Sequence, residues 1–142
     1  MTTPPLSATP AEITALLQKY RTVAVVGISA NHSRPSHQVA AYLKDHGFRI
    51  VPVNPGQKEV LGEKCYPSLK DIPFPVDIVD IFRQVEAIPA IVDEAIALGA
   101  KVVWMQLGLT EPASAAKARA AGLTVVMDHC LKVEHARLMA GG

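Results

Sequence analysis

A glycine, a serine and an arginine follow an apolar run near the start of this chain, and together they suit the binding of a phosphate. The run at residues 22–26 ends at Gly27, and Ser29 and Arg34 follow in a polar loop that leads into a helical pattern. Glycine permits a sharp turn, serine offers a hydroxyl and arginine offers a forked cation. A helix N-terminus adds unpaired N–H groups and a partial positive charge. The pattern therefore predicts that Ser29 and the loop amides hold one phosphate of a nucleotide and that Arg34 binds a second. The alternative is a solvated loop in which Ser33 or Ser36 caps the helix.

The loop departs from the dinucleotide fingerprint G-x-G-x-x-G. That fingerprint needs glycine at 27, 29 and 32, where the chain has Gly27, Ser29 and His32. The next strand pattern ends in Val53-Asn54-Pro55, without the acid that holds the ribose hydroxyls of NAD. A phosphorylated ribose is therefore not repelled, and Lys58 is close enough in sequence to reach it. These features favour a nucleotide other than conventionally bound NAD, although Asn54 serves equally well as a turn residue.

The run at residues 76–83 carries two acids inside an apolar pattern and two further candidates at its end. A buried carboxylate is destabilising unless it is paired, so we expect Asp77 and Asp80 to bond neighbouring backbone or a cation rather than to act in acid–base catalysis. Phe82 and Arg83 stand at the strand end, where an aromatic face packs a base or an apolar arm and a guanidinium meets a phosphate. The alternative places Phe82 in the core and Arg83 in solvent.

One segment near the end of the chain contains residue types found in metal sites and in Cys–His dyads. It consists of Asp128, His129 and Cys130, with His135 further along. The chain supplies no set of ligands at zinc spacing, because its other cysteine, Cys65, lies far away in sequence. We expect no metal site and no catalytic residue here, and we interpret the segment as a strand end that leads into the last helix.

Composition and charge limit the classes of partner. The chain has 142 residues, 49% hydrophobic and 5% aromatic, which indicates one domain with an aliphatic core. A net charge of +1 without a basic run argues against nucleic acid and an anionic membrane as partners. The start of the chain lacks a signal-peptide pattern, no membrane span is present, and the two cysteines are not closely spaced, so we expect a cytoplasmic protein with free thiols.

Five strand patterns alternate with helical patterns along the chain. The strands are expected at 22–27, 48–53, 76–82, 101–106 and 123–127, and the helices at 10–20, 36–46, 88–98, 110–121 and 131–139, with caps at Thr9 and Thr110. Segment 57–75 is expected to be a loop with a short helical turn near Ser68. The pattern predicts an α/β fold, a doubly wound, five-stranded, Rossmann-like parallel sheet, in one domain over residues 1–142 with residues 1–8 flexible.

We expect the strand order 3-2-1-4-5, numbered along the chain. Because the carboxyl ends of parallel strands share one edge of a sheet, residues 27–29, 53–55, 82–83, 106–108 and 128–130 are expected to meet there, at the point where the strand order reverses. This is where a ligand binds in such sheets.

Six stretches, at the five strand ends and in the first loop, resemble one known family. They are Val25-Val26-Gly27-Ile28-Ser29, Arg34-Pro35-Ser36, Val51-Pro52-Val53-Asn54-Pro55, Val76-Asp77-Ile78-Val79-Asp80-Ile81-Phe82-Arg83, Val103-Trp104-Met105-Gln106-Leu107-Gly108 and Val126-Met127-Asp128-His129-Cys130. The chain resembles the small stand-alone CoA-binding proteins, which are similar to the N-terminal CoA-binding domain of the succinyl-CoA synthetase α subunit. The resemblance extends from about residue 22 to residue 138.

The resemblance implies that coenzyme A binds at the carboxyl edge of the sheet. Carried over by position, it points to Gly27, Ile28, Ser29, Arg34, Val53, Asn54, Pro55, Lys58, Phe82, Arg83 and Gln106. It implies no catalytic residue, because the phosphorylated histidine of the synthetase belongs to a second domain. The residues agree with CoA, whose 3′-phosphate and pyrophosphate need a few cations and no ribose-binding acid.

The leading hypothesis is a protein that binds CoA or an acyl-CoA without catalysis. Three charge-assisted contacts of about 1.5 to 3 kcal/mol each allow at best micromolar affinity. Two alternatives stay open: an NAD(P)-dependent oxidoreductase, and an accessory subunit that lends its CoA site to a separate acyl-CoA ligase. A homo-oligomer also stays open. A minor hypothesis is a mixed disulfide between Cys130 and the CoA thiol.

Overall fold

A five-stranded parallel sheet forms the centre of the computed structural model, which describes residues 6–141. Its strands are β1 (Thr22–Val26), β2 (Arg49–Val53), β5 (Ile78–Ile81), β6 (Val102–Met105) and β7 (Thr124–Val126). All four neighbouring pairs are parallel. The expected α/β fold, a doubly wound five-stranded sheet, is confirmed.

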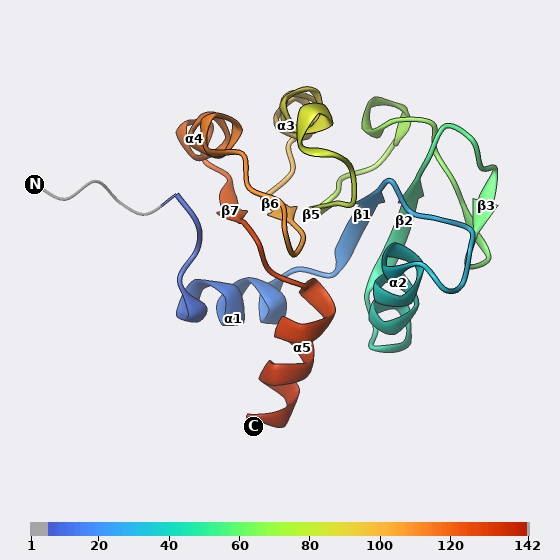
Figure 1. Ribbon diagram of the computed structural model, residues 1–142, viewed down its shortest axis with the longest axis horizontal. Helices are drawn as coiled ribbons and strands as arrows, with labels where there is room; N and C mark the ends of the chain where they lie inside the picture. Colours follow the sequence, from blue (N-terminus) through green and yellow to red (C-terminus); the bar gives the residue numbers. More distant parts are fainter. Residues whose placement is uncertain (1–5, 142) are drawn as a thin grey trace, which may run out of the picture.

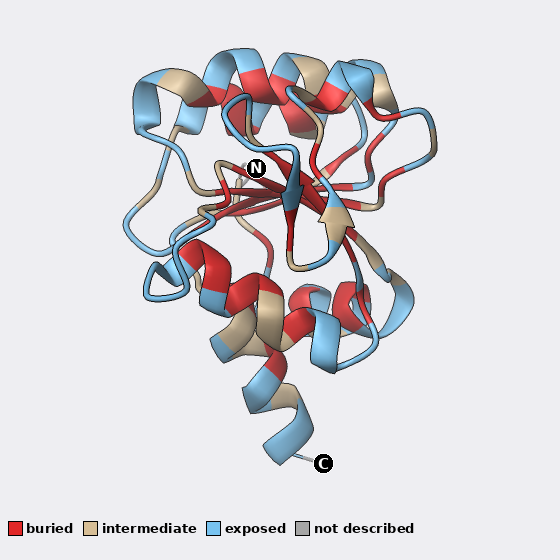
Figure 2. Ribbon diagram, turned by 90° about the vertical axis from the view of Figure 1, so that its right-hand side faces the viewer, coloured by how far each residue is buried: buried red, intermediate tan, exposed pale blue. Residues whose placement is uncertain are grey.

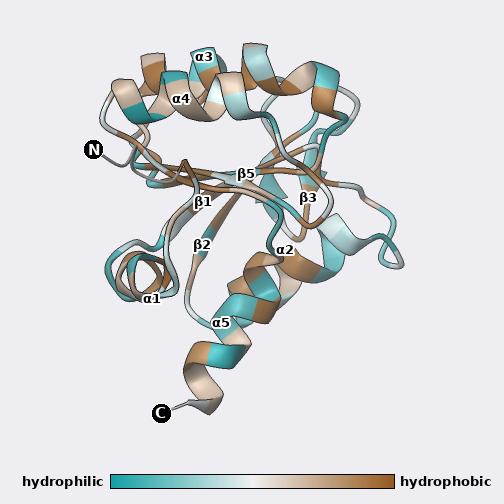
Figure 3. Ribbon diagram, turned by 60° about the vertical axis from the view of Figure 1, so that its left-hand side comes forward, coloured by the Kyte–Doolittle hydropathy of each residue, from teal (hydrophilic) through white to brown (hydrophobic). Residues whose placement is uncertain are grey.

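Helices cover both faces of the sheet (Figure 1). The helices α1 (Pro10–Lys19), α2 (Pro35–Asp45) and α5 (Leu131–Ala140) lie on one face, and α3 (Ile88–Leu98) and α4 (Pro112–Ala120) lie on the other. Figure 3 shows the resulting three layers, with the apolar strands between the helices. None of the helices within residues 6–141 is long and apolar enough to cross a bilayer.

The strands are apolar at nearly every position because both faces of the sheet are covered. Alternate residues of β1 enter different cores: Val23 and Val25 pack with α1, α2 and α5, whereas Ala24 and Val26 pack with α3 and α4. Figure 2 shows the buried residues along the strands and on the inner sides of the helices. The sheet is therefore a rigid platform whose carboxyl edge carries the loops.

The helix starts follow from local sequence signals in one case and not in another. Thr9 caps α1 through a capping box with Glu12, as expected. At α4 the expected cap, Thr110, is wrong: Glu111 occupies the cap position, and its carboxylate accepts a hydrogen bond from the Ser114 amide at 2.7 Å. A carboxylate near a helix N-terminus also gains from the helix dipole.

The expected strand order is wrong. In chain order the sheet runs 2-1-3-4-5 (β2-β1-β5-β6-β7) rather than 3-2-1-4-5, so β2 is an edge strand and the order reverses between β1 and β5. Pro52 in β2 carries the signal that identifies the edge, because proline cannot donate a ladder hydrogen bond and is confined to edge strands. In the observed order the end of β5 lies directly beside the end of β1.

Segment 57–75 has more structure than a loop. It contains a short hairpin, β3 (Glu59–Val60) and β4 (Glu63–Lys64), that the sequence pattern missed. The expected helical turn near Ser68 is present as the 3-10 helix η1 (Leu69–Asp71). Tyr66 forms a parallel bridge with Val53 and so extends the sheet beyond β2.

The segment expected to be flexible, residues 1–8, lies only partly within the described range. Residues 1–5 lie outside it. Ser7 accepts a hydrogen bond from the Met127 amide at 3.0 Å, and the Ala8 amide donates to the carbonyl of Val125 at 2.7 Å. These bonds tie the residues before α1 to the last strand.

Candidate functional site at the carboxyl edge

Gly27 joins the ends of three strands. Its amide donates to the carbonyl of Val53 at 2.9 Å, and the Phe82 amide donates to the carbonyl of Val26 at 2.8 Å. Gly27 has φ +89°, and a β-carbon at this position would overlap the carbonyl oxygen of Phe82 and lie 2.8 Å from Cδ of Arg83. Only glycine fits, so the ends of β1 and β5 form one continuous surface.

The loop after Gly27 is held by its own side chains. The Ser29 amide donates to Oγ of Ser36 at 3.0 Å, and the Asn31 amide donates to Oγ of Ser29 at 3.0 Å. Nδ1 of the buried His37 donates to the carbonyl of Ser29 at 2.9 Å. The start of α2 and the loop therefore form one fixed unit.

Five backbone amides of this unit have no hydrogen-bond partner among the described residues. They belong to Ile28, Ala30, His32, Ser36 and His37. Two of them lie in the first turn of α2, where helix N–H groups lack intrahelical partners and carry the positive end of the helix dipole. Proline at the start of α2 and the absence of a side-chain cap leave this end open. The arrangement suits an anion that several N–H groups bind together.

Three adjoining hollows surround the end of β1. The loop hollow, about 350 Å³, is lined by residues that include Gly27, Ser29, Arg34, Ser36, Asn54 and Phe82. The α3 hollow, about 260 Å³, lies on the other side of Gly27 and is lined by residues that include Val53, Pro55, Arg83 and Ile91. The apolar hollow, about 600 Å³, is lined by residues that include Phe82, Arg83, Gln106, Leu107, Leu109 and Cys130. The carboxyl edge is therefore open along its length.

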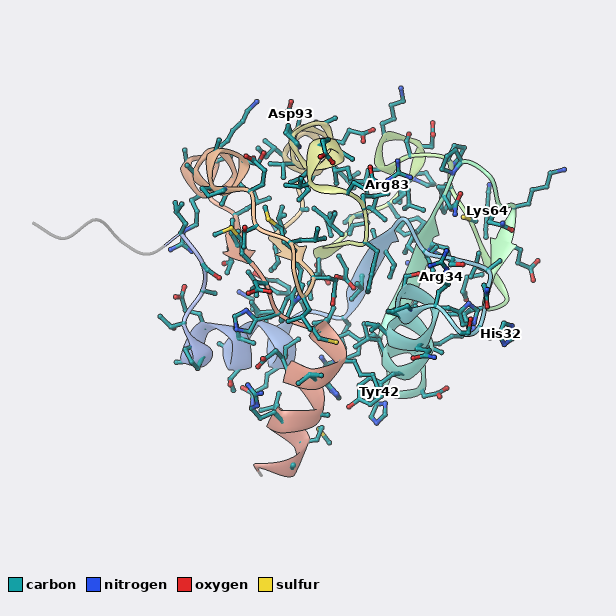
Figure 4. All side chains as sticks on the ribbon, in the orientation of Figure 1. His32, Arg34, Tyr42, Lys64, Arg83 and Asp93 are labelled. Atoms are coloured by element: carbon teal, nitrogen blue, oxygen red, sulfur yellow. The ribbon has the colours of Figure 1, made fainter. Side chains whose placement is uncertain are left out.

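Two arginines border these hollows. Arg34 precedes α2 and Arg83 follows β5, and Figure 4 shows both beside the end of β1. Both side chains are exposed, and neither forms an ion pair with a residue in the described range 6–141. Arg34 lines the loop hollow, whereas Arg83 lines the α3 hollow and the apolar hollow. Lys58 is also exposed, but it lines none of the three hollows.

The other expected residues of the first two strand ends act mainly through their backbone. Ile28 and Val53 are buried, so only their backbone atoms reach the edge. Asn54 donates to the carbonyl of Ile28 at 2.8 Å and accepts from the Gly56 amide at 2.8 Å. Both ends of its carboxamide are thus used to hold the two loops together, and Pro55 lines the α3 hollow.

The two strand acids differ in their surroundings. Asp77 accepts hydrogen bonds from the amides of Arg21 and Thr22 at 3.2 and 3.1 Å, as expected for a carboxylate that bonds nearby backbone. Asp80 is fully buried and bonds neither backbone nor a cation, so the expectation is wrong for this residue: its partner is the carboxamide of Gln106. Burial raises the pKa of Asp80 to about 7, although the hydrogen bond from Gln106 lowers it.

Sequence reasoning missed several residues of the site. Ser36 is one of them: its Oγ accepts the hydrogen bond from the Ser29 amide that holds the loop. Leu107 and Leu109 form part of the apolar hollow, and Leu107 is 72% exposed, which is unusual for leucine. His129 lies apart from these hollows, with Nδ1 on the Met127 carbonyl at 2.7 Å. Over residues 6–141, no group of three His, Cys, Asp or Glu side chains is arranged to hold a metal ion.

Known proteins are similar to this chain in sequence and in fold. The chain is 43% identical over 126 residues to the uncharacterized protein YneT of Bacillus subtilis (strain 168), a match that spans 89% of this chain and 93% of that protein. A solved structure, of a hypothetical protein from Pyrococcus horikoshii OT3, has a TM-score of 0.90 and 40% identity over 98% of each chain. A stretch of 94 residues is 36% identical to the ADP-forming acetate–CoA ligase II of Archaeoglobus fulgidus, and it spans 64% of this chain but 14% of the ligase.

The family match covers the sheet and the whole carboxyl edge. Residues 21–136 match the family model described as a CoA binding domain, so the match runs from the residue before β1 into α5. It includes Gly27, the loop before α2 and the ends of all five strands. This agrees with the resemblance found in the six sequence stretches, and the chain therefore belongs to the CoA-binding domain family.

Proposed function

We propose that this protein binds coenzyme A or an acyl-CoA at the carboxyl edge of its sheet and acts by binding alone. The observation that carries the proposal is the presence of unpartnered amides at Ile28, Ala30, Ser36 and His37, of which Ile28, Ala30 and Ser36 line the loop hollow. A pyrophosphate supplies acceptors for several such donors at once, and Arg34 adds a forked cation. Hydrogen bonds from N–H groups to a charged oxygen are worth about 1.5 to 3 kcal/mol each.

The apolar hollow fits the other half of the molecule. It adjoins the loop hollow, since Pro35 and Phe82 line both. CoA joins a charged nucleotide to a long, mostly apolar pantetheine arm, and a polar hollow beside an apolar one matches that division. Arg83 stands between the α3 hollow and the apolar hollow, where it can meet a further phosphate. We assign the phosphates to the loop hollow and the arm to the apolar hollow.

The loop residues support binding rather than catalysis. The best-placed candidates for a nucleophile and a base are Ser36 and His37. Oγ of Ser36 accepts a hydrogen bond from the Ser29 amide, and Nδ1 of His37 donates one to the Ser29 carbonyl. Neither side chain is paired with the other as a catalytic dyad would be. In this proposal they act as supports for the loop. The proposal keeps all the residues expected from the sequence, and it includes Lys58 as an exposed cation close in sequence to Asn54 and Pro55, although Lys58 lines none of the three hollows.

A second candidate function is an accessory role beside a separate ligase chain. The observation that favours it is the 36% identity to a segment that makes up 14% of an ADP-forming acetate–CoA ligase. In such a role the CoA site is the same, and a partner chain supplies the chemistry. Affinity capture from a native extract followed by an acyl-CoA ligase assay distinguishes the two: recovery of ligase activity supports the accessory role, and its absence favours a lone CoA carrier or sensor.

Titration calorimetry tests the proposed function. CoA, dephospho-CoA and NAD are titrated into the protein under the same buffer and salt conditions. We expect micromolar affinity for CoA, weaker binding of dephospho-CoA because it lacks the 3′-phosphate, and the weakest binding for NAD. Absence of heat with CoA at millimolar concentration, or tighter binding of NAD, would refute the proposal.

A further inference from the structure

Asp80 lies directly beneath the floor of the apolar hollow. It pairs across the sheet with Val25 on β1 and with Trp104 on β6. Phe82 follows Asp80 by two residues, and Gln106 follows Trp104 by two residues, so both lie on the same face of the sheet as Asp80. Both Phe82 and Gln106 line the apolar hollow. Asp80 is 0% exposed, and its Oδ2 atom has no hydrogen-bond partner among the described residues. A buried polar group without a complete set of partners calls for an explanation.

The carboxylate of Asp80 fixes how the carboxamide of Gln106 is turned. Nε2 of Gln106 donates to Oδ1 of Asp80. A carboxylate can only accept, so the NH₂ end of the carboxamide must face Asp80 and the oxygen must face away. That oxygen has no partner within residues 6–141, yet it is not among the buried unsatisfied atoms. Because Gln106 lines the apolar hollow, its carbonyl oxygen opens into that hollow.

We propose that Asp80 is a positioning residue that turns Gln106 so that its carboxamide oxygen accepts a hydrogen bond from the pantetheine arm of CoA. The proposal rests on the proposed function and names the chemistry that the apolar hollow recognises. The arm carries donors only at its two amide N–H groups, its hydroxyl and its thiol. A fixed acceptor among Phe82, Leu107 and Leu109 selects for such a donor, because hydrogen bonds are stronger in apolar surroundings.

The same pair makes the selection depend on pH. When Asp80 is protonated its hydroxyl needs an acceptor, so the carboxamide of Gln106 turns over and presents NH₂ to the hollow. The titratable or charged groups that line this hollow are Arg83, at the end of β5, and Cys130, at the start of α5. Burial gives Asp80 a pKa of about 7, so the change falls near neutral pH. The contribution of the arm to binding should therefore weaken as the pH falls from 8 to 6.

The test compares two ligands on three proteins. CoA carries the arm, and adenosine 3′,5′-bisphosphate lacks it; each is titrated by calorimetry at pH 8 and pH 6 into the wild type, Asp80→Asn and Gln106→Met. At pH 8 we expect both variants to bind CoA about threefold to tenfold more weakly than the wild type, the loss of one hydrogen bond. Both should bind the armless nucleotide as the wild type does. The ratio of the two affinities should fall with pH only in the wild type.

Side-chain NMR distinguishes this positioning role from a purely structural one, because only a positioning role makes the Gln106 resonances follow the protonation of Asp80. The side-chain amide resonances of Gln106 should titrate with a midpoint near the pKa of about 7 of Asp80, and Asp80→Asn should abolish that titration. If Asp80→Asn does not fold, Gln106→Met and the NMR titration of the wild type decide the question. Equal losses for both ligands, unchanged CoA binding by Gln106→Met, or a Gln106 resonance that does not titrate would overturn the proposal. A wild type that binds neither ligand instead overturns the proposed function, which makes the two failures distinguishable.

Discussion

Gly27 and Phe82 stand at the ends of adjacent parallel strands with no room for a side chain between them. A β-carbon on Gly27 would overlap the carbonyl oxygen of Phe82 and would lie 2.8 Å from Cδ of Arg83. This close approach makes the loop after β1 and the residues after β5 one surface. It depends on the strand order, in which β5 lies next to β1 and β2 lies on the other side of β1.

Gly27→Ala should destabilise the protein by about 2 kcal/mol or more, because the new methyl group adds a clash to a backbone with positive φ. Urea denaturation measures the change. Gly99→Ala is the matched control, since Gly99 has φ +80° but nothing within 4 Å of the added carbon, and it should lose only about 1 kcal/mol. Equal losses in the two variants would show that the approach to Phe82 is not tight.

Asp80→Asn should change how stability depends on pH. Burial raises the pKa of Asp80 from 3.8 to about 7, so the folded state holds a proton that the unfolded state has lost. The stability of the wild type should therefore fall as pH rises from about 4 to 7, by about 2.5 kcal/mol between pH 5 and pH 8 from this group. Urea denaturation at both pH values should show this decrease in the wild type and not in Asp80→Asn. The same pH profile in both proteins would contradict the assignment.

Arg34→Ala should weaken CoA binding about tenfold at low salt, because a charge-assisted hydrogen bond to phosphate is lost. The deficit should shrink as salt is added, since an exposed cation is screened. Lys101→Ala is the control: Lys101 is exposed just before β6, at the opposite edge of the sheet, so it should bind CoA like the wild type. Calorimetry at two salt concentrations checks both variants, and an equal effect of the two substitutions would refute a specific role for Arg34.

Cys130 should exchange with CoA disulfide. Its thiolate attacks one sulfur of the disulfide, a Cys130–CoA disulfide forms and one CoA thiolate leaves. The half-buried Cys130 lines the apolar hollow, whereas Cys65 is buried and its pKa is raised by burial. Intact-mass spectrometry should show one added CoA, which dithiothreitol removes. Cys65→Ser should keep the adduct and Cys130→Ser should lose it; an adduct that persists in Cys130→Ser would disprove this site.

Local sequence patterns predicted most of the secondary structure. The apolar runs located all five strands of the sheet, and helix α3 has the expected bounds. The expected strand order is wrong because both orders satisfy the same connection rules, and the feature that distinguishes them is a single residue, Pro52, which marks β2 as an edge strand. The hairpin β3–β4 has two residues in each strand, too few to show a periodicity.

The sequence also predicted part of the candidate site. Residues that follow strands directly, such as Gly27, Arg83 and Gln106, could be placed at the carboxyl edge because parallel strands share that edge. The contact between Asp80 and Gln106 could not, since it joins residues 26 positions apart through the pairing of β5 with β6. Lys58 was expected from its distance in sequence alone, and it lines none of the three hollows.

The most direct measurement is a titration of the ¹⁵N-labelled protein with CoA, followed by amide NMR. The account predicts that the largest shifts fall on the unpartnered amides of Ile28, Ala30, Ser36 and His37, with further shifts at Phe82 and Gln106. A separate hollow of about 380 Å³ between α1 and α5, lined by His129 and Arg137, should stay unaffected. Shifts confined to that hollow, or no shifts at millimolar CoA, would contradict the account.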